Sequence, residues 1–353
     1  MRRSHTIITT IAALALGASP LMSSAQGVIR RDSVPAPALR NNMVRDPTWD
    51  RVSVYLPPSY YTRPRRRYPV LYFLHGFAAD DRALIKGNFQ NMNIRISMDS
   101  LISTGDVGEM IVVMPNARNA FDGSFYTNSP VTGNWEQFIV RDLVNFVDRK
   151  YRTLRTRKAR GLAGHSMGGY GALRIGMRHP ETFSAVYALS AYGLAFEDSV
   201  ERGYDRNWRA AMTLTDWQQF AKAGFITNLL LAFGAANAPD AGNPPFFVAL
   251  PYLVSGDSLV LDQRIARRWS IRPLEMVPEF VGNLRRLAIA FDAGAQDGFK
   301  DIPIRATELD RLMTDLAIPH VFELYTGGHG DHIRARMESK VLPFFSRELQ
   351  PAR

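Results

Sequence analysis

The feature that most constrains how this chain can fold is the alternation of short, mostly apolar segments with longer amphipathic ones. The short segments have the length and the residue types of strands, and they span residues 52–56, 69–74, 110–114, 159–163, 184–189, 287–291 and 320–325. Helical patterns lie between several of them, as in residues 135–150, where Trp135, Phe138 and Leu143 share one stripe. Strands with few polar residues are typical of a parallel sheet covered on both faces. The sequence therefore predicts an α/β fold with a mostly parallel central sheet and helices on both faces.

This alternation is interrupted between residues 193 and 286. The interruption is rich in aromatic residues, including Trp208, Trp217 and Trp269, and it contains several prolines. A connection of this length is uncommon inside a compact domain and is often functional. We expect an inserted, largely helical cap over one end of the sheet, with helix around residues 215–233. The alternative is a peripheral elaboration that lies away from any site.

The N-terminal residues have the pattern of a processing signal. Arg2 and Arg3 precede an apolar stretch over residues 7–18, and small residues follow at 23–25. We predict a secretory signal peptide over residues 1–25, a flexible lead-in over residues 26–47 and one domain over residues 48–350. The alternative, an uncleaved membrane anchor, is disfavoured because the apolar run is shorter than the ~20 residues that span a bilayer. We expect an exported protein, periplasmic or extracellular, without stable membrane insertion.

Composition excludes several classes of function. The chain contains no cysteine, so it cannot be a disulfide scaffold, a thiolate metal site or an enzyme with a cysteine nucleophile. The formal net charge is +10, but the basic residues are scattered, and the only tight run is at residues 65–67. A basic balance of this kind affects solubility and non-specific attraction, so we expect no nucleic-acid partner.

The clearest chemical motif is the pentapeptide Gly164-His165-Ser166-Met167-Gly168, which fits G-x-S-x-G. It follows a predicted strand and precedes a helical run at residues 170–179, which is the setting that this motif requires. Ser166 would then lie at the N-terminus of a helix, where negative charge is favoured. The sequence predicts Ser166 as a nucleophile, and the alternative is a glycine-rich turn without chemistry.

A serine nucleophile needs a base that is held in place by a third group. In folds that use the G-x-S-x-G turn, the order along the chain is serine, acid, histidine. Asp297 follows the predicted strand at residues 287–291, and His329 follows the strand at residues 320–325. Both loops open at the edge of the sheet that carries Ser166, so these side chains are candidates for the acid and the base.

The residues leave alternatives for both roles. Asp292 stands at the end of its predicted strand and Asp301 lies four residues beyond Asp297; we favour Asp297 because the acid should lie on a loop just beyond the strand. His332 begins the predicted C-terminal helix and competes with His329 as the base. The run from His329 to His332 could also suggest metal ligands, but no other segment completes a metal-binding spacing. We expect no metal and no organic cofactor.

Taken in order, several motifs resemble one family. They are the segments at residues 52–58 and 68–76, the glycine-rich serine turn, His179-Pro180, Gly294-x-x-Asp297 and Gly327-Gly328-His329. Together they resemble the putative esterase family of α/β-hydrolases, the esterase D group, which includes feruloyl esterases, S-formylglutathione hydrolases and the antigen 85 mycolyltransferases. The resemblance covers residues 48–192 and 287–348, and it concerns the family and not the substrate. The inserted segment departs from compact members, so their pocket residues cannot be transferred.

The resemblance implies an α/β-hydrolase fold and a division of roles in the site. It implies Ser166 as nucleophile, His329 as base and Asp297 as the acid that orients it, and it favours His329 over His332. Backbone N–H groups of Phe77 and Met167 would form the oxyanion hole. The expected function is a serine esterase that acts on small-molecule or carbohydrate esters through an acyl-enzyme. The alternatives are an acyltransferase to a carbohydrate or lipid hydroxyl, and a secreted binding protein without catalysis.

Overall fold

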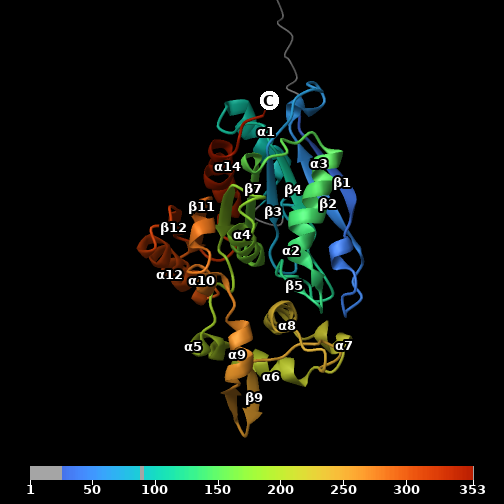
Figure 1. The fold of residues 1–353 in the computed structure, drawn as a ribbon. Coiled ribbons are helices and arrows are strands. Elements are labelled where there is room, and N and C mark those ends of the chain that lie inside the picture. Colours follow the sequence, from blue (N-terminus) through green and yellow to red (C-terminus); the bar gives the residue numbers. More distant parts are fainter. Residues whose placement is uncertain (1–25, 88–90, 353) are drawn as a thin grey trace, which may run out of the picture.

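The structure is a computed structural model, and it describes residues 26–87 and 91–352. At its centre is an eight-stranded sheet in the order β1-β2-β4-β3-β7-β8-β11-β12 (Figure 1). The strands are β1 (Val28–Pro35), β2 (Trp49–Leu56), β3 (Val70–Leu74), β4 (Ile111–Pro115), β7 (Arg160–His165), β8 (Ala185–Leu189), β11 (Ala288–Gly294) and β12 (Val321–Tyr325). From β4 to β12 all neighbours pair in parallel. The pairs β1–β2 and β2–β4 are antiparallel, so β2 alone runs opposite to the other strands. The prediction of a mostly parallel sheet is confirmed.

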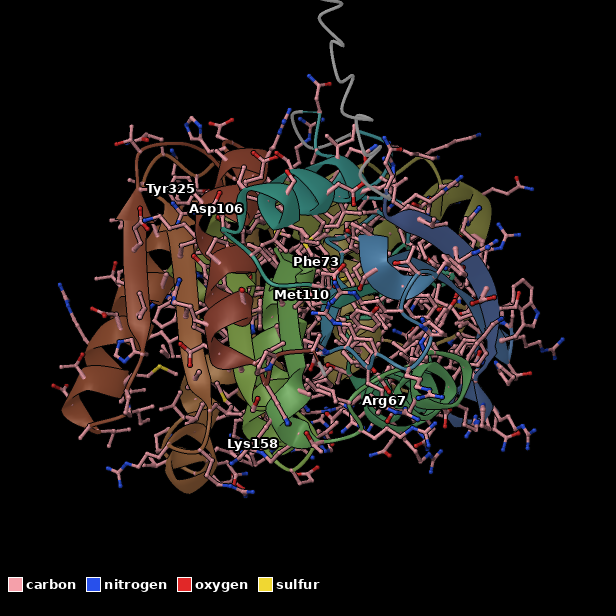
Figure 2. All side chains as sticks on the ribbon, turned by 90° about the horizontal axis from the view of Figure 1, so that it is seen from above. Arg67, Phe73, Asp106, Met110, Lys158 and Tyr325 are labelled. Carbon is pink, nitrogen blue, oxygen red and sulfur yellow. The ribbon has the colours of Figure 1, made fainter. Side chains whose placement is uncertain are left out.

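Helices cover both faces of this sheet. On one face lie α1 (Ile94–Thr104), α13 (Ile333–Arg336) and α14 (Leu342–Glu348). On the other lie α2 (Trp135–Gln137), which continues through a π-helical stretch into α3 (Val144–Lys150), then α4 (Met167–Arg178) and α12 (Asp301–Asp315). Figure 2 looks onto the edge near Arg67, Met110 and Lys158, where β3, β4 and β7 begin, and side chains fill the space on both faces. The apolar side chains packed on the two faces of the sheet fix the position of its opposite end, where these strands finish.

The N-terminal part of the described chain differs from the prediction. Residues 28–35 form β1, which pairs with β2 along its whole length from Val28 opposite Leu56 to Pro35 opposite Trp49. Beyond β1, Ala36 and Leu39 are buried in the core. The prediction of a flexible lead-in is therefore wrong for this stretch. Its polar side chains suit an edge strand, which needs few apolar residues because one side faces solvent. The predicted signal peptide lies outside the described residues.

The segment between β8 and β11 forms a separate group of elements. These are α5 (Asp198–Glu201), α6 (Asp205–Thr213), α7 (Trp217–Phe220), α8 (Phe225–Asn237), the hairpin of β9 (Tyr252–Ser255) and β10 (Ser258–Leu261), α9 (Gln263–Trp269), α10 (Pro273–Met276) and α11 (Val281–Leu284). In Figure 1, α6 to α9 and β9 lie together beyond the end of the sheet where the parallel strands finish. Part of the aromatic content packs internally, since the Trp208 ring centroid is 5.2 Å from that of Trp269 and 5.3 Å from that of Tyr252.

A buried arginine joins distant parts of this segment to one another. The Arg272 guanidinium donates to Glu201 at 3.0 Å and to the backbone oxygen of Trp269 at 2.8 Å. It also lies 4.4 Å from the centroid of the Phe233 ring, and that ring contacts Tyr170 on α4. Because both charged partners are buried, removing one would leave an uncompensated charge in the interior. The segment itself contacts α4 through Tyr170, whose ring packs against Phe233 and whose hydroxyl donates to Asn237. No helix in the described part of the chain is long and apolar enough to cross a bilayer.

Candidate active site

Ser166 lies on a sharp turn between β7 and α4. Its backbone has φ 57° and ψ −116°, a conformation that is uncommon for a residue with a side chain. The turn depends on the two glycines of the pentapeptide. A Cβ on Gly164 would lie 2.2 Å from the Gly168 oxygen, and a Cβ on Gly168 would lie 2.0 Å from the Leu74 oxygen. Only glycine fits at either position. The close approach of the backbone at this turn therefore explains why both glycines occur in the sequence motif.

The structure brings Ser166, His329 and Asp297 together in one chain of hydrogen bonds. Oγ of Ser166 lies 2.9 Å from Nε2 of His329, and Nδ1 of His329 lies 2.8 Å from Oδ2 of Asp297. A carboxylate accepts hydrogen bonds, so Nδ1 carries a proton and Nε2 is free to accept from the serine hydroxyl. The other carboxylate oxygen of Asp297 accepts from the backbone N–H of Phe299 at 2.8 Å. The imidazole is thus oriented from behind and faces the serine.

A second histidine holds the loop that carries His329. Nε2 of His165 lies 2.8 Å from the backbone oxygen of His329, and the two rings are 4.9 Å apart between centroids. Burial, followed by the neighbouring His329 charge, lowers the pKa of His165 to about 3. His165 is therefore neutral near pH 7, and its Nε2–H donates to that carbonyl. This hydrogen bond fixes His329 relative to His165, the residue directly before Ser166.

The loop after β3 passes directly beside Ser166. A Cβ on Gly76 would lie 3.4 Å from the Cβ of Ser166, so the backbone of this loop lies against the turn. A Cβ on Gly123 would meet both the Phe77 ring and the Met167 sulfur at 2.6 Å, which brings the predicted oxyanion residues to one place. Neither the Phe77 nor the Met167 backbone N–H has an acceptor among the described residues. Two unused donors therefore flank the serine.

The alternative acids and the alternative base lie elsewhere. Asp292 is inside β11, where it accepts from Arg336 at 2.7 Å and from the Tyr187 hydroxyl at 2.9 Å. Asp301 is the first residue of α12, and burial raises its pKa. His332 precedes α13 with φ 60° and its ring contacts Tyr325. None of the three has a hydrogen bond to Ser166 or to His329 in the part of the chain that the structure describes.

No cluster of three or more histidine or acidic side chains in residues 26–87 and 91–352 is arranged to hold a metal ion. Asp331, between the two histidines that suggest metal ligands in the sequence, instead accepts from the Gly328 backbone N–H at 2.7 Å. Its carboxylate shapes the loop that carries His329.

Comparison with known proteins decides the family. A family model described as putative esterase matches residues 47–336. The chain belongs to this family. The match includes Ser166, Asp297 and His329 as well as the inserted segment, and the predicted resemblance is confirmed.

Individual relatives of this esterase-family chain are similar over shorter stretches. An esterase of Mycobacterium tuberculosis is 32% identical over 144 residues, which are 39% of this chain and 28% of that protein. An S-formylglutathione hydrolase of Arabidopsis thaliana is 29% identical over 147 residues, which are 39% of this chain and 50% of that protein. The chain therefore spans half or less of the length of these curated relatives.

Two solved structures are similar to this chain along nearly its whole length. A ferulic acid esterase has a TM-score of 0.60 at 23% identity and covers 92% of this chain and 99% of its own. An S-formylglutathione hydrolase from Agrobacterium tumefaciens has a TM-score of 0.59 at 16% identity and covers 93% of this chain and 98% of its own. At such identities the likeness concerns the fold, and the predicted α/β-hydrolase fold is confirmed.

Other contacts that support the site could not be predicted from the sequence of this esterase-family chain. The Tyr126 hydroxyl donates to the backbone oxygen of His75 at 3.0 Å, and the Ala117 N–H donates to Nε2 of His75 at 2.8 Å. Burial lowers the pKa of His75 to about 4, so this ring is neutral and supports the loop that leads to Phe77. Such long-range contacts follow from packing and not from a local pattern.

Asp50 accepts a hydrogen bond from Asn116, the neighbour of Ala117, and is buried. Its burial predicts how the free energy of unfolding depends on pH. The hydrogen bond from the Asn116 side chain is 3.0 Å long, and burial raises the pKa of the Asp50 carboxyl from 3.8 to about 8 despite that bond. The folded state therefore binds this proton more tightly than the unfolded chain does. Between pH 4 and pH 8 the free energy of unfolding should fall as pH rises, by up to about 1.4 kcal/mol per pH unit from this group.

Asp50→Asn should remove this contribution and flatten the pH dependence between pH 5 and pH 8. Urea unfolding at several pH values measures the slope, and Asp257→Asn at the exposed turn of the β9–β10 hairpin is the matched control. Equal slopes for the wild type and Asp50→Asn would contradict the prediction.

Proposed function

We propose that this chain is a serine carboxylic-ester hydrolase in which Ser166, His329 and Asp297 form the catalytic triad. The observation that carries the proposal is the continuous hydrogen-bond chain from Ser166 to His329 at 2.9 Å and from His329 to Asp297 at 2.8 Å. Membership of the esterase family supports the same class of reaction. The small-molecule or carbohydrate ester that the enzyme acts on is part of this proposal.

In the first step, Nε2 of His329 takes the proton of the Ser166 hydroxyl while Oγ attacks the acyl carbon. A new C–O bond forms, and the electron pair of the carbonyl moves to its oxygen. Asp297 keeps the imidazole in the required tautomer and stabilises its charged form. The N–H groups of Phe77 and Met167 bind the oxyanion, and they need no reorganisation because the backbone already holds them.

In the second step, the imidazolium of His329 gives its proton to the leaving alkoxide, and the alcohol departs. The acyl group remains on Ser166. Water then gives a proton to His329 and attacks the acyl carbon. As the bond between the acyl carbon and Oγ breaks, the imidazolium returns that proton to Oγ, and the acid leaves with Ser166 and His329 in their original states. Each proton moves through the same nitrogen, so one base serves both halves of the reaction.

The active-site serine is tested directly by a fluorophosphonate probe. We expect one equivalent of probe to bind per protein, on Ser166, because within residues 26–87 and 91–352 only that hydroxyl has a hydrogen bond to an imidazole. Mass spectrometry of the labelled peptide identifies the site, and heat-denatured protein is the control because denaturation separates the three side chains. If the native protein takes up no probe, the proposed chemistry is wrong and the alternative of a non-catalytic binding protein gains support.

Product analysis separates hydrolysis from acyl transfer, since both proceed through the same acyl-enzyme. The protein is incubated with a p-nitrophenyl ester in the presence and absence of a glycosyl or lipid alcohol. Free acid is the expected product in both samples. Formation of a new ester to the exclusion of free acid would favour the acyltransferase alternative.

We also propose that the protein is exported. The argument rests on the N-terminal sequence, in which Arg2 and Arg3 precede the apolar stretch over residues 7–18 and small residues at 23–25. Cleavage after residue 25 would remove none of the residues that form the site.

A further inference from the structure

Three phenylalanine rings form an arc beside the site, and they come from three different segments. Phe77 belongs to the loop after β3, Phe225 is the first residue of α8, and Phe299 follows Asp297. The ring centroids of Phe77 and Phe225 are 5.2 Å apart, and those of Phe225 and Phe299 are 6.5 Å apart. The arc ends at the base, because the Phe299 and His329 rings are 4.9 Å apart.

Phe225 differs from the other two in its exposure. Its ring is 51% exposed, whereas Phe77 is 9% exposed and Phe299 packs against the main core. Helix α8 does not need Phe225 for its own packing, since Leu229, Leu230 and Phe233 on the same helix are buried. A large apolar side chain that is exposed next to a reactive group is typical of a ligand-binding surface.

The directions of the bonds in the tetrahedral intermediate indicate which part of the ester lies next to each ring. The leaving oxygen must face Nε2 of His329 to receive its proton, and the oxyanion must face the N–H groups of Phe77 and Met167. Phe299 contacts His329 and therefore borders the leaving alcohol. The Phe225 ring lies closer to Phe77 than to Phe299 and has no ring contact with His329 among the described residues. It therefore borders the remaining direction, which is that of the acyl group.

We propose that Phe225 is a specificity-determining residue, which contacts a bulky apolar acyl group and favours such esters over acetyl esters. The inference rests on the proposed function, and it assigns a role to the inserted segment that supplies α8. Gly224, which precedes the helix with φ 90° and has no atom within 4 Å of an added Cβ, leaves the space next to Phe225 open. A flat ring or a long alkyl chain would cover the exposed face of Phe225.

The test is a series of p-nitrophenyl esters with a constant alcohol and acyl groups from acetyl to octanoyl and 3-phenylpropanoyl. We expect Phe225→Ala to lower kcat/KM for the two largest acyl groups by about ten-fold or more, the range for lost apolar contacts in a pocket. The acetyl ester should change by less than about two-fold. Phe225→Leu should restore part of the preference, because it keeps an apolar side chain at this position.

Leu253→Ala is the matched control, since Leu253 is 56% exposed in the same segment but lies on the β9–β10 hairpin. It should leave the whole series unchanged, and thermal unfolding should give similar midpoints for all variants. An equal loss on every ester for Phe225→Ala would overturn the inference, because it would indicate that Phe225 only supports the Phe77 loop. An unchanged series would overturn it as well.

The failure of the proposed function is distinguishable from the failure of this inference. If the wild-type protein is labelled by a fluorophosphonate and turns over esters, while Phe225→Ala leaves the acyl preference as it was, only the role of Phe225 is wrong. If the wild type is neither labelled nor active on any ester of the series, the proposed function is wrong, and the role of Phe225 is overturned with it.

Discussion

Ser166→Ala is expected to lower kcat for p-nitrophenyl ester hydrolysis by at least about 10,000-fold, because it removes the proposed nucleophile. The variant should fold, since alanine keeps the Cβ and the turn at φ 57° is already imposed by its glycine neighbours. Initial rates with p-nitrophenyl butyrate, normalised to protein concentration, measure the loss. Thermal unfolding of the same preparation shows whether the fold is retained.

Ser190→Ala is the matched control for this substitution. Ser190 follows the neighbouring strand β8, is buried, and also has a positive φ, of 39°. Its hydroxyl lies 3.5 Å from the Tyr325 hydroxyl and has no hydrogen bond to His329 among the described residues. Activity should therefore stay within a few-fold of the wild type, in keeping with a lost neutral hydrogen bond. Substantial turnover by Ser166→Ala would show that another residue is the nucleophile.

Asp297→Asn is the substitution with the second largest expected effect, a fall in kcat of about 10,000-fold. Asparagine keeps the size of the side chain and an oxygen for the Phe299 N–H, so the loop should keep its shape. Its amide group, however, no longer fixes the proton on Nδ1 of His329, and it does not stabilise the charged imidazole. The measurement is kcat at several pH values, together with the rate of fluorophosphonate labelling, which should fall in parallel.

The two other aspartates distinguish this role from a general effect of lost charge. Asp301→Asn should retain most of its kcat, because Asp301 lies at the start of α12 and not at His329. Asp292→Asn should lower stability more than kcat, since it leaves the buried Arg336 guanidinium with a weaker partner. If Asp301→Asn alone were inactive, the assignment of Asp297 would be wrong.

The sequence predicts the parallel part of the sheet because its inner strands, β3, β4, β7, β8 and β11, are buried on both faces. Such strands have few polar residues, and each ends where a glycine, proline or polar residue begins a loop. The same property locates most of the candidate site, since Ser166 and Asp297 follow buried strands of this kind. His329 follows β12, which is mostly apolar in sequence but partly exposed at the edge of the sheet. Their proximity then follows from the parallel direction of β7, β11 and β12 and from the order of the strands.

Strand β1 and the arc of aromatic rings could not be predicted in this way. In β1 the side chains of Arg30, Arg31 and Asp32 give no apolar pattern, and the strand forms because its backbone pairs with β2. Phe225 and Phe299 are separated by more than 70 residues in the chain, and their contact depends on how α8 packs against α4. Hydrophobic periodicity contains no information on contacts of that range.

Strands β8 and β11 are hydrogen-bonded neighbours, with Leu189 opposite Asp292, although the connection between them is about a hundred residues long. The entropy of closing a loop grows only with the logarithm of its length, by about 0.6 kcal/mol for each doubling. Relative to a common connection of about six residues, the longer path costs about 2–3 kcal/mol. Insertions and deletions at this point therefore have little effect on the distances among Ser166, Asp297 and His329. Over evolutionary time, the residues that contact the acyl group can change in number and kind while the reacting groups stay in place.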